Sequence, residues 1–156
     1  MSAIPAKASA TLLALHRPES FAASFRARWV QAGEFRLHYR SAVAADALPE
    51  PTPQHACAVG FVLPKRQCRH AARRNLIRRI AREHIRRHLL EHGVAPEPVT
   101  GQALSLPVLV LRQQARLGPQ WVSAQSPALR RYLHETLGRL LDEWERVRQR
   151  GAAKAP

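Results

Sequence analysis

The stretch "FVLPKRQCRHAARRNLIRRIAREHIR" (residues 61–86) begins as an apolar strand and becomes a helix rich in arginine. Pro64 ends the strand, because proline cannot donate a hydrogen bond to a sheet. A short basic connector follows, and the apolar spacing predicts a helix over residues 72–92. The next apolar run, 104–112, predicts a strand buried on both faces. A strand, a helix and a second strand in this order predict a crossover whose helix covers one face of a sheet.

The predicted helix 72–92 has two unlike faces. Aliphatic side chains gather on one side of the helical wheel, whereas the other side is almost purely cationic. Arginines four residues apart repel each other by roughly 0.2–0.5 kcal/mol per pair, and faces that only meet solvent usually mix the two signs of charge. The unmixed row therefore favours a polyanion as its partner over a passive surface. That row consists of Arg74, Arg78, Arg82 and Arg86.

The charge of the whole chain supports the same interpretation. Its 156 residues include 25 Lys and Arg against 11 Asp and Glu, a formal net charge of +14. Such a balance concerns partners rather than fold, and it leaves nucleic acid, an anionic membrane surface or an acidic protein as candidates. No apolar run is long enough for a transmembrane helix, and the early stretch "ATLLAL" is too short for a secretion signal. We therefore expect a cytoplasmic protein.

Two segments precede the first predicted strand. Residues 1–17 are small and show no clear period, so we expect a poorly ordered N-terminal tail. Proline at a first helical turn and glycine at the end predict a helix over 18–33. On that helix, Phe21, Phe25 and Trp29 would recur every fourth residue and share one face.

Alternation and capping residues predict the remaining elements. Apolar and polar residues alternate over 34–40, and 55–63 is almost wholly apolar, so both read as strands. A Ser-Pro pair at 126–127 predicts the start of a final helix that reaches about residue 148. We expect loops at 42–55 and 93–104 and a C-terminal tail at 149–156.

Several residues that could carry chemistry are better explained without it. His84, His88 and His92 share one side of the arginine-rich helix, and two histidines four apart can bind zinc. No cysteine or further carboxylate stands at ligand spacing, so we predict no metal site. Cys57 and Cys68 form no CxxC motif and are expected as buried thiols. The sequence also shows no nucleophile elbow or phosphate-binding glycine loop, so its own side chains look unsuited to a chemical step.

Phe21 and Phe25, one helical turn apart, admit two interpretations. Aromatic rings beside a basic groove can stack on unpaired bases, and each stacked base contributes about 1–3 kcal/mol. Spacing alone is explained more simply by two core side chains.

Residues 61–86 resemble the signature of the bacterial ribonuclease P protein component. That signature is a strand ending in two basic residues, a basic connector, and a helix that opens with Arg-Asn and carries basic residues at fixed offsets. The spacing matches without a gap, although Leu76 stands where the family commonly has a third basic residue. The resemblance implies RNA binding by Lys65, Arg66, Arg69, Arg74, Asn75, Arg78, Arg79, Arg82 and Arg86.

The resemblance also implies a fold and a function for residues 18–148. The fold would be an α/β (α+β) sandwich in which three helices wrap a four-stranded sheet with a left-handed crossover. The function would be that of the protein subunit of ribonuclease P, which binds a catalytic RNA and helps it to remove the 5′ leader of precursor tRNA. That RNA would carry out the phosphodiester hydrolysis with Mg²⁺ bound by the RNA. A groove for the single-stranded leader would be lined by Phe21, Phe25, Arg36 and His38.

Other classes of protein share this charge but fit the pattern less well. A stand-alone reader of duplex DNA would read bases with a few residues of one helix, whereas this helix offers mostly phosphate-binding side chains. A ribosomal-type RNA-binding protein would be equally basic, and the ungapped signature argues against it. A helix at a membrane surface needs large apolar residues beside its cations, whereas the apolar face here is aliphatic and suits a core.

Overall fold

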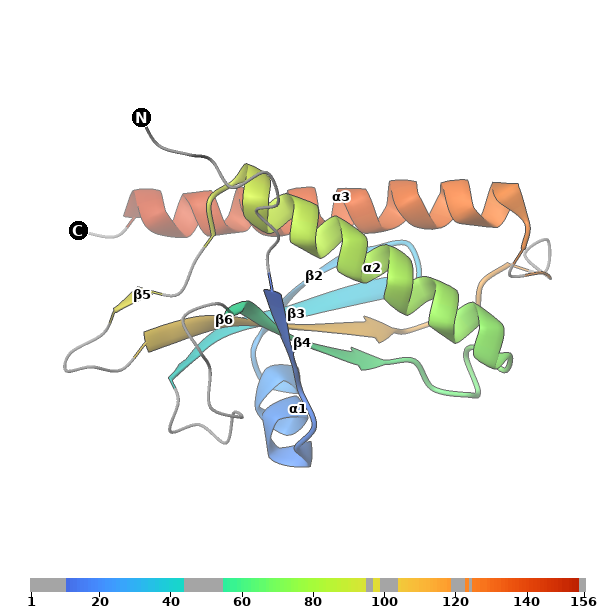
Figure 1. The fold of residues 1–156 in the computed structure, drawn as a ribbon, viewed down its shortest axis with the longest axis horizontal. Helices are drawn as coiled ribbons and strands as arrows, with labels where there is room; N and C mark the ends of the chain where they lie inside the picture. Colours follow the sequence, from blue (N-terminus) through green and yellow to red (C-terminus); the bar gives the residue numbers. More distant parts are fainter. Residues whose placement is uncertain are drawn as a thin grey trace.

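The computed structural model describes residues 11–43, 55–94, 97–98, 104–118, 123 and 125–154. Within them the chain forms a mixed α/β fold, with helices on both faces of one sheet (Figure 1). In chain order the elements are β1 (Thr11–Ala14), α1 (Pro18–Phe25), β2 (Arg28–Ala32), β3 (Phe35–Val43), β4 (His55–Val62), α2 (Ala71–Glu91), β5 (Glu97–Pro98), β6 (Leu104–Gln113) and α3 (Pro127–Lys154).

One sheet runs through the molecule in the order β1-β4-β6-β3-β2, and the short strand β5 pairs with β6 outside this path. The pairs β1–β4 and β4–β6 are parallel, whereas β6–β3 and β3–β2 are antiparallel. Because the parallel neighbours β4 and β6 flank α2 in sequence, the predicted crossover is confirmed; its left hand stays a prediction. The three strands predicted from the sequence pattern are joined by β1, β2 and β5, which formed where a tail, a helix and a loop were expected. The sheet therefore has six strands instead of the four that the resemblance implied.

The larger core lies between the sheet and the helices α2 and α3, which cover the same face (Figure 1). Phe35 and Leu37 of β3 point into it with almost no exposed surface, as do Ile77 of α2 and Leu133 of α3. Complete burial of a side chain of this size contributes about 1.5–3 kcal/mol. The opposite face carries α1 and a smaller apolar cluster around Val108 and its neighbours. The strands therefore leave part of that second face to polar and aromatic side chains.

The predicted helix over 18–33 is wrong in its second half. The helix ends at Phe25, and the chain then forms β2, which pairs with β3 through a tight turn. Gly33 occupies that turn with a φ of 54°, a conformation that only glycine adopts without strain. Pairing with β3 gives the backbone of β2 its hydrogen-bond partners. Trp29 consequently lies on a strand and not on the helical face that the sequence predicted.

The predicted N-terminal tail also needs correction. Residues 11–14 form β1, which pairs in parallel with β4 and brings Leu12 against the larger core. Residues 1–10 lie outside the described part of the chain. Leu13 and Leu15 pack on the smaller cluster, so backbone pairing and apolar contacts on both faces of the sheet order a segment whose composition alone gave no strand signal.

The final helix runs further than expected. The sequence predicted a helix to about 148 and a tail over 149–156, whereas α3 continues to Lys154. No proline interrupts this stretch, and Gly151 is exposed. An exposed glycine costs a helix only about 1 kcal/mol relative to alanine, so a helix as long as α3 can include it.

The other predicted elements are confirmed within a few residues. They are the strands at 34–40, 55–63 and 104–112 and the helices at 72–92 and from 126–127. The expected loops 42–55 and 93–104 fall largely outside the described residues, but within the second of them residues 97–98 form the short strand β5 and not loop. Cys57 and Cys68 are buried free thiols, as predicted. No helix in the described part of the chain combines the length and apolarity needed to span a membrane.

Candidate nucleic-acid interface

The cationic face of α2 exists as predicted. Arg79, Arg82 and Arg86 are exposed, and Arg74 and Arg78 are half-buried. Within the described residues, none of these five arginines forms an ion pair with a carboxylate. The face therefore presents positive charge that the fold itself does not neutralise.

Two residues at the start of α2 also stabilise the fold. Arg74 donates from Nη1 to the carbonyl oxygens of Cys68, at 2.7 Å, and of Arg69, at 3.0 Å. Arg78 donates from Nη1 to Oδ1 of Asn75 at 3.0 Å. A guanidinium has five N–H donors, so each arginine keeps donors for a ligand. Their internal hydrogen bonds orient the groups that a phosphate would meet.

The basic connector between β4 and α2 is fixed to the end of β6. Arg116 donates from Nε to the carbonyl oxygen of Arg66 at 2.8 Å. Gln67 donates to the carbonyl oxygen of Gln114, and Gln113 donates to that of Gln67, each at 3.2 Å. This anchoring could not be predicted from the connector alone, because its partners lie more than forty residues later in the chain. The exposed basic side chains that it positions are Lys65, Arg66 and Arg69.

Two further side chains join α2 to the sheet. The guanidinium of Arg82 lies 5.1 Å from the centre of the Phe61 ring, within the range of a cation–π contact. Leu76, at the position where the family commonly has a basic residue, is 4% exposed and belongs to the larger core. Leucine at position 76 therefore packs in the core, and the cationic face has one basic side chain fewer than the resemblance implied.

The opposite face of the sheet brings together aromatic and basic side chains from four elements. On β3, Arg36 and His38 alternate with the buried Phe35 and Leu37, so they point away from the larger core. The strand register places Trp29 of β2 across from His38. We call this set the aromatic–arginine surface, and it consists of Phe25, Trp29, Arg36, His38 and Arg112.

The side chains of the aromatic–arginine surface are stacked on one another. The guanidinium of Arg36 lies 4.0 Å from the centre of the Trp29 ring, and that of Arg112 lies 5.0 Å from the Phe25 ring. Trp29 is 45% exposed and Phe25 is 36% exposed, so both rings can meet a ligand. The sequence did not reveal Trp29 or Arg112 as members of a site, because it placed Trp29 on a helix and Arg112 at the end of a buried strand.

The four predicted groove residues differ in accessibility. Phe21 is half-buried and packs so closely on Gly60 that a Cβ atom there would lie 2.6 Å from the Phe21 ring, so its position is explained by packing. His38 is 2% exposed and meets the edge of the Phe25 ring, with 5.4 Å between the ring centres. Burial, followed by the nearby Arg112 and Arg36, lowers the pKa of His38, so the ring is neutral at pH 7. Phe25 is exposed, and Phe21 and Arg36 are half-buried, so of the four predicted residues only His38 is closed to a ligand.

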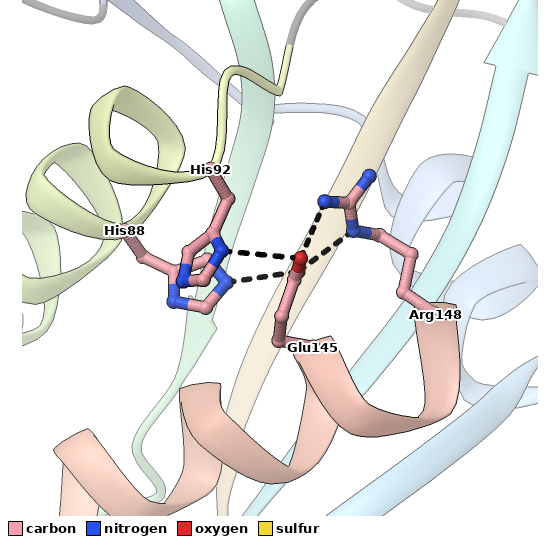
Figure 2. A network of polar contacts seen from close by, with 4 residues as sticks. All are labelled: His88, His92, Glu145 and Arg148. Atoms are coloured by element: carbon pink, nitrogen blue, oxygen red, sulfur yellow. Dashed lines mark hydrogen bonds and ion pairs between the residues drawn. The ribbon is translucent and has the colours of Figure 1, made fainter. Parts of the chain in front are cut away.

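The predicted histidine row lies on α2 but divides between two sets of partners on α3. His84 is hydrogen-bonded to His134, with 2.8 Å between Nε2 and Nδ1. His88 and His92 instead face the carboxylate of Glu145 (Figure 2), at 3.2 Å from Nε2 of His88 and 3.4 Å from Nδ1 of His92. The sequence showed no carboxylate at ligand spacing from these histidines, and the structure supplies one, Glu145, from another helix.

Arg148 completes this cluster from the next turn of α3. It donates from Nε and Nη2 to the two carboxylate oxygens of Glu145, at 2.8 and 2.6 Å. These hydrogen bonds are the largest cause of the lowered pKa of Glu145, about 2, so the carboxylate is ionised at neutral pH. Burial lowers the pKa of His88. The cluster is an internal polar network that joins α2 to α3, distinct from the exposed cationic face, which runs along α2 from Arg74 to Arg86.

Comparison with known proteins gives two findings. The family model described as Ribonuclease P matches residues 11–99, more than half of the chain. A protein of Bordetella petrii named "Ribonuclease P protein component" is 36% identical over 77 residues, which make up 49% of this chain and 59% of that protein. The match to this relative thus spans less than two thirds of its length.

Proposed function

This chain belongs to the Ribonuclease P family, and we propose that it is the protein subunit of a ribonucleoprotein that removes the 5′ leader of precursor tRNA. In this proposal the chain binds the catalytic RNA and the leader, and the RNA performs the endonucleolytic step. The protein's contribution is to neutralise phosphates and to hold single-stranded RNA.

One observation carries the RNA-binding part of the proposal. The cationic face of α2 continues into the anchored basic connector, and its arginines have no carboxylate partner within the described residues. Cations that release counterions from a phosphate backbone give binding a steep dependence on salt. Arginine suits this purpose because its planar fork can make two contacts with one phosphate.

The test replaces Arg79, Arg82 and Arg86 together by alanine, because all three are exposed and none makes an internal hydrogen bond among the described residues. Removal of three phosphate contacts should lower the slope of log affinity against log salt by about 2–3 and weaken binding to the catalytic RNA. Circular dichroism should remain that of the wild type.

A matched control removes the same charge elsewhere. The exposed residues Arg130, Arg131 and Arg139 of α3 are replaced by alanine, and this variant should keep most of the affinity. If both triple variants lose the same affinity, the net charge of the chain and not the face of α2 binds the RNA, and the proposed docking surface is wrong. If leader removal by the reconstituted complex at low Mg²⁺ is undiminished in the α2 variant, the subunit function of this face is wrong.

We place the leader on the aromatic–arginine surface. Its exposed rings offer stacking platforms, and the guanidinium groups of Arg36 and Arg112 lie beside them. Stacking on aromatic rings tolerates any base, because every base has a π face. That tolerance suits leaders whose sequences differ from one precursor to the next.

The leader proposal is tested by single alanine substitutions. Phe25→Ala and Trp29→Ala should each weaken binding of leader-bearing precursor by about 1–3 kcal/mol, with a smaller effect on mature tRNA. Phe21→Ala is the matched control: loss of its packing on Gly60 should lower the stability of the fold by about 2 kcal/mol while leaving the preference for the leader. Equal losses for precursor and mature tRNA in the first two variants would contradict leader binding on this surface.

Magnesium, in this proposal, is bound by the RNA. Mg²⁺ prefers oxygen ligands in octahedral geometry. The group of described residues that could hold a metal ion, His88, His92 and Glu145, offers two nitrogens and one carboxylate, and so does not suit Mg²⁺. The protein would lower the magnesium requirement by supplying positive charge of its own.

A further inference from the structure

The ends of α2 and α3 place two imidazoles and a carboxylate around one point (Figure 2). We propose that His88, His92 and Glu145 bind a zinc ion that links the C-terminal end of α2 to α3. This site lies apart from both proposed RNA surfaces, and the proposal does not depend on them.

The spacing of the donor atoms fits a zinc ion. Zn–N and Zn–O bonds of about 2.0–2.1 Å in a tetrahedral site require neighbouring ligand atoms about 3.3–3.4 Å apart. Nε2 of His88 lies 3.2 Å from Oε2 of Glu145, and Nδ1 of His92 lies 3.4 Å from Oε1 of Glu145; one donor atom from each of the three residues fits within 4.8 Å of the others. Because the two short distances involve different oxygens, one edge of the tetrahedron already has the right length, and a small rotation of the carboxylate and the imidazoles would bring the remaining donor around the ion.

The chemistry of the donors favours zinc among the divalent ions. Two histidines four residues apart on one helix present their rings on the same side, as in known helical zinc sites. Imidazole nitrogens suit zinc, whereas magnesium and calcium prefer sites made of oxygen alone. Three protein ligands leave the fourth position of the tetrahedron to a water molecule.

The ion has a route to the site. His92 keeps 35% of its side chain exposed, whereas Glu145 and His88 keep 8% and 6%. A cavity of about 520 Å³ is lined by Gly93 and Trp144, the chain neighbours of His92 and Glu145, and by Arg148. The ion can enter past the partly exposed His92.

Arg148 already supplies a positive charge to Glu145. A carboxylate has about four lone-pair positions, and Arg148 uses one on each oxygen of Glu145, so others remain for a metal. Its positive charge nonetheless opposes a second cation beside the same carboxylate. The side chain of Arg148 is 38% exposed and can turn toward solvent when zinc binds. Arginine and zinc are thus expected to compete for Glu145.

The test titrates the full-length chain with zinc chloride by isothermal calorimetry, and records the visible absorption of Co²⁺ in the same site. The wild type should bind one ion, and bound Co²⁺ should show the intense bands of tetrahedral coordination. His92→Ala should weaken binding by more than the about 10–100-fold that loss of an outer partner costs, because it removes a direct ligand. The exposed His92 makes this variant compatible with folding.

Arg148→Met should change the zinc affinity in the opposite direction to His92→Ala. Removal of the competing cation should tighten zinc binding several-fold, with the native fold checked by circular dichroism. His16→Ala, which removes an exposed histidine outside the site, should bind zinc as the wild type does. If the wild type binds no zinc, if His92→Ala binds as tightly as the wild type, or if Arg148→Met leaves the affinity unchanged, the three-ligand site is refuted and the cluster is an internal ion network only.

Discussion

The two ends of α2 use their basic side chains in opposite ways. From the N-terminal end to the middle, arginines such as Arg79 and Arg82 are exposed and without carboxylate partners among the described residues. Toward the C-terminal end, His88 is buried against Glu145, which Arg148 of α3 also binds. The first arrangement destabilises the fold slightly by repulsion and leaves the charge available to a partner, whereas the second uses the side chain to stabilise the fold. One helix therefore joins a binding face to a structural clamp, which consists of His88, Glu145 and Arg148.

The sharpest way to break this comparison is Glu145→Ala. The substitution leaves His88 buried without its partner and Arg148 without its carboxylate, and removing one partner of a buried ionic network costs about 3–5 kcal/mol. Because Arg148 is partly exposed, we expect the lower end, about 3 kcal/mol, in urea unfolding. Arg86→Ala, its counterpart on the binding face, should stay within about 0.5 kcal/mol of the wild type, because Arg86 is exposed. Equal destabilisation in the two variants would remove the distinction between the ends of α2.

Acid should unfold the clamp and spare the binding face. The pKa of Glu145 is lowered from 4.5 to about 2, chiefly by the hydrogen bonds from Arg148, and the pKa of His88 is lowered below 6.5 by burial. In both cases the unfolded chain binds more protons than the folded chain, so stability decreases as the pH falls. The contribution of His88 to the free energy of unfolding is fully present above about pH 6.5. The contribution of Glu145 is lost between pH 4.5 and about 2.

The measurement is the urea midpoint as a function of pH. Glu145→Gln should flatten the loss below pH 4.5, since the titrating group is gone. Arg79→Ala should keep the wild-type profile, because that residue has no carboxylate partner within the described residues. A wild-type profile in Glu145→Gln would show that other groups cause the acid sensitivity.

The binding end of α2 could be predicted from sequence because its pattern is local. The apolar positions repeat with the helical period over the whole of α2, and the basic positions occur in an uninterrupted stretch, so both the bounds and the exposed face followed from spacing. The connector's basic residues followed from the same stretch, but their anchoring by Gln113 and Arg116 did not. Those partners are brought close by the pairing of β4 with β6, which no local pattern specifies.

The clamp and β2 depended on contacts between distant parts of the chain. The spacing of His88 and His92 was visible, but Glu145 is more than fifty residues away and meets them only because α2 packs on α3. One signal was available: Glu145 follows Trp144 on the apolar side of α3, where an acidic residue needs a partner. The five residues of β2 fit a helix or a strand equally well, and the pairing with β3 decided between the two.

A smaller effect distinguishes arginines within the binding end itself. Arg74→Ala removes the hydrogen bonds to the carbonyl oxygens of Cys68 and Arg69, and should cost about 1–2 kcal/mol of stability in urea unfolding. Arg79→Ala should cost nothing measurable, while each variant lowers the salt slope of RNA binding by about 1. The two variants thus share an effect on binding and differ in stability. A stable Arg74→Ala variant would mean that the connector keeps its shape without that guanidinium.

The smallest expected effect comes from Glu83, an exposed glutamate of α2 itself. Glu83 pairs with Arg87 at 3.4 Å, and both side chains are more than half exposed. An exposed pair of this kind contributes about 0.3–0.5 kcal/mol, so Glu83→Gln should barely change the urea midpoint, whereas the same substitution at Glu145 should shift it strongly. RNA affinity should change in the other direction: the loss of a negative charge beside Arg82 should tighten RNA binding slightly at low salt. If Glu83→Gln destabilised the chain as much as Glu145→Gln, burial would not be what separates the clamp from the face, and the charge on α2 would serve the fold along its whole length.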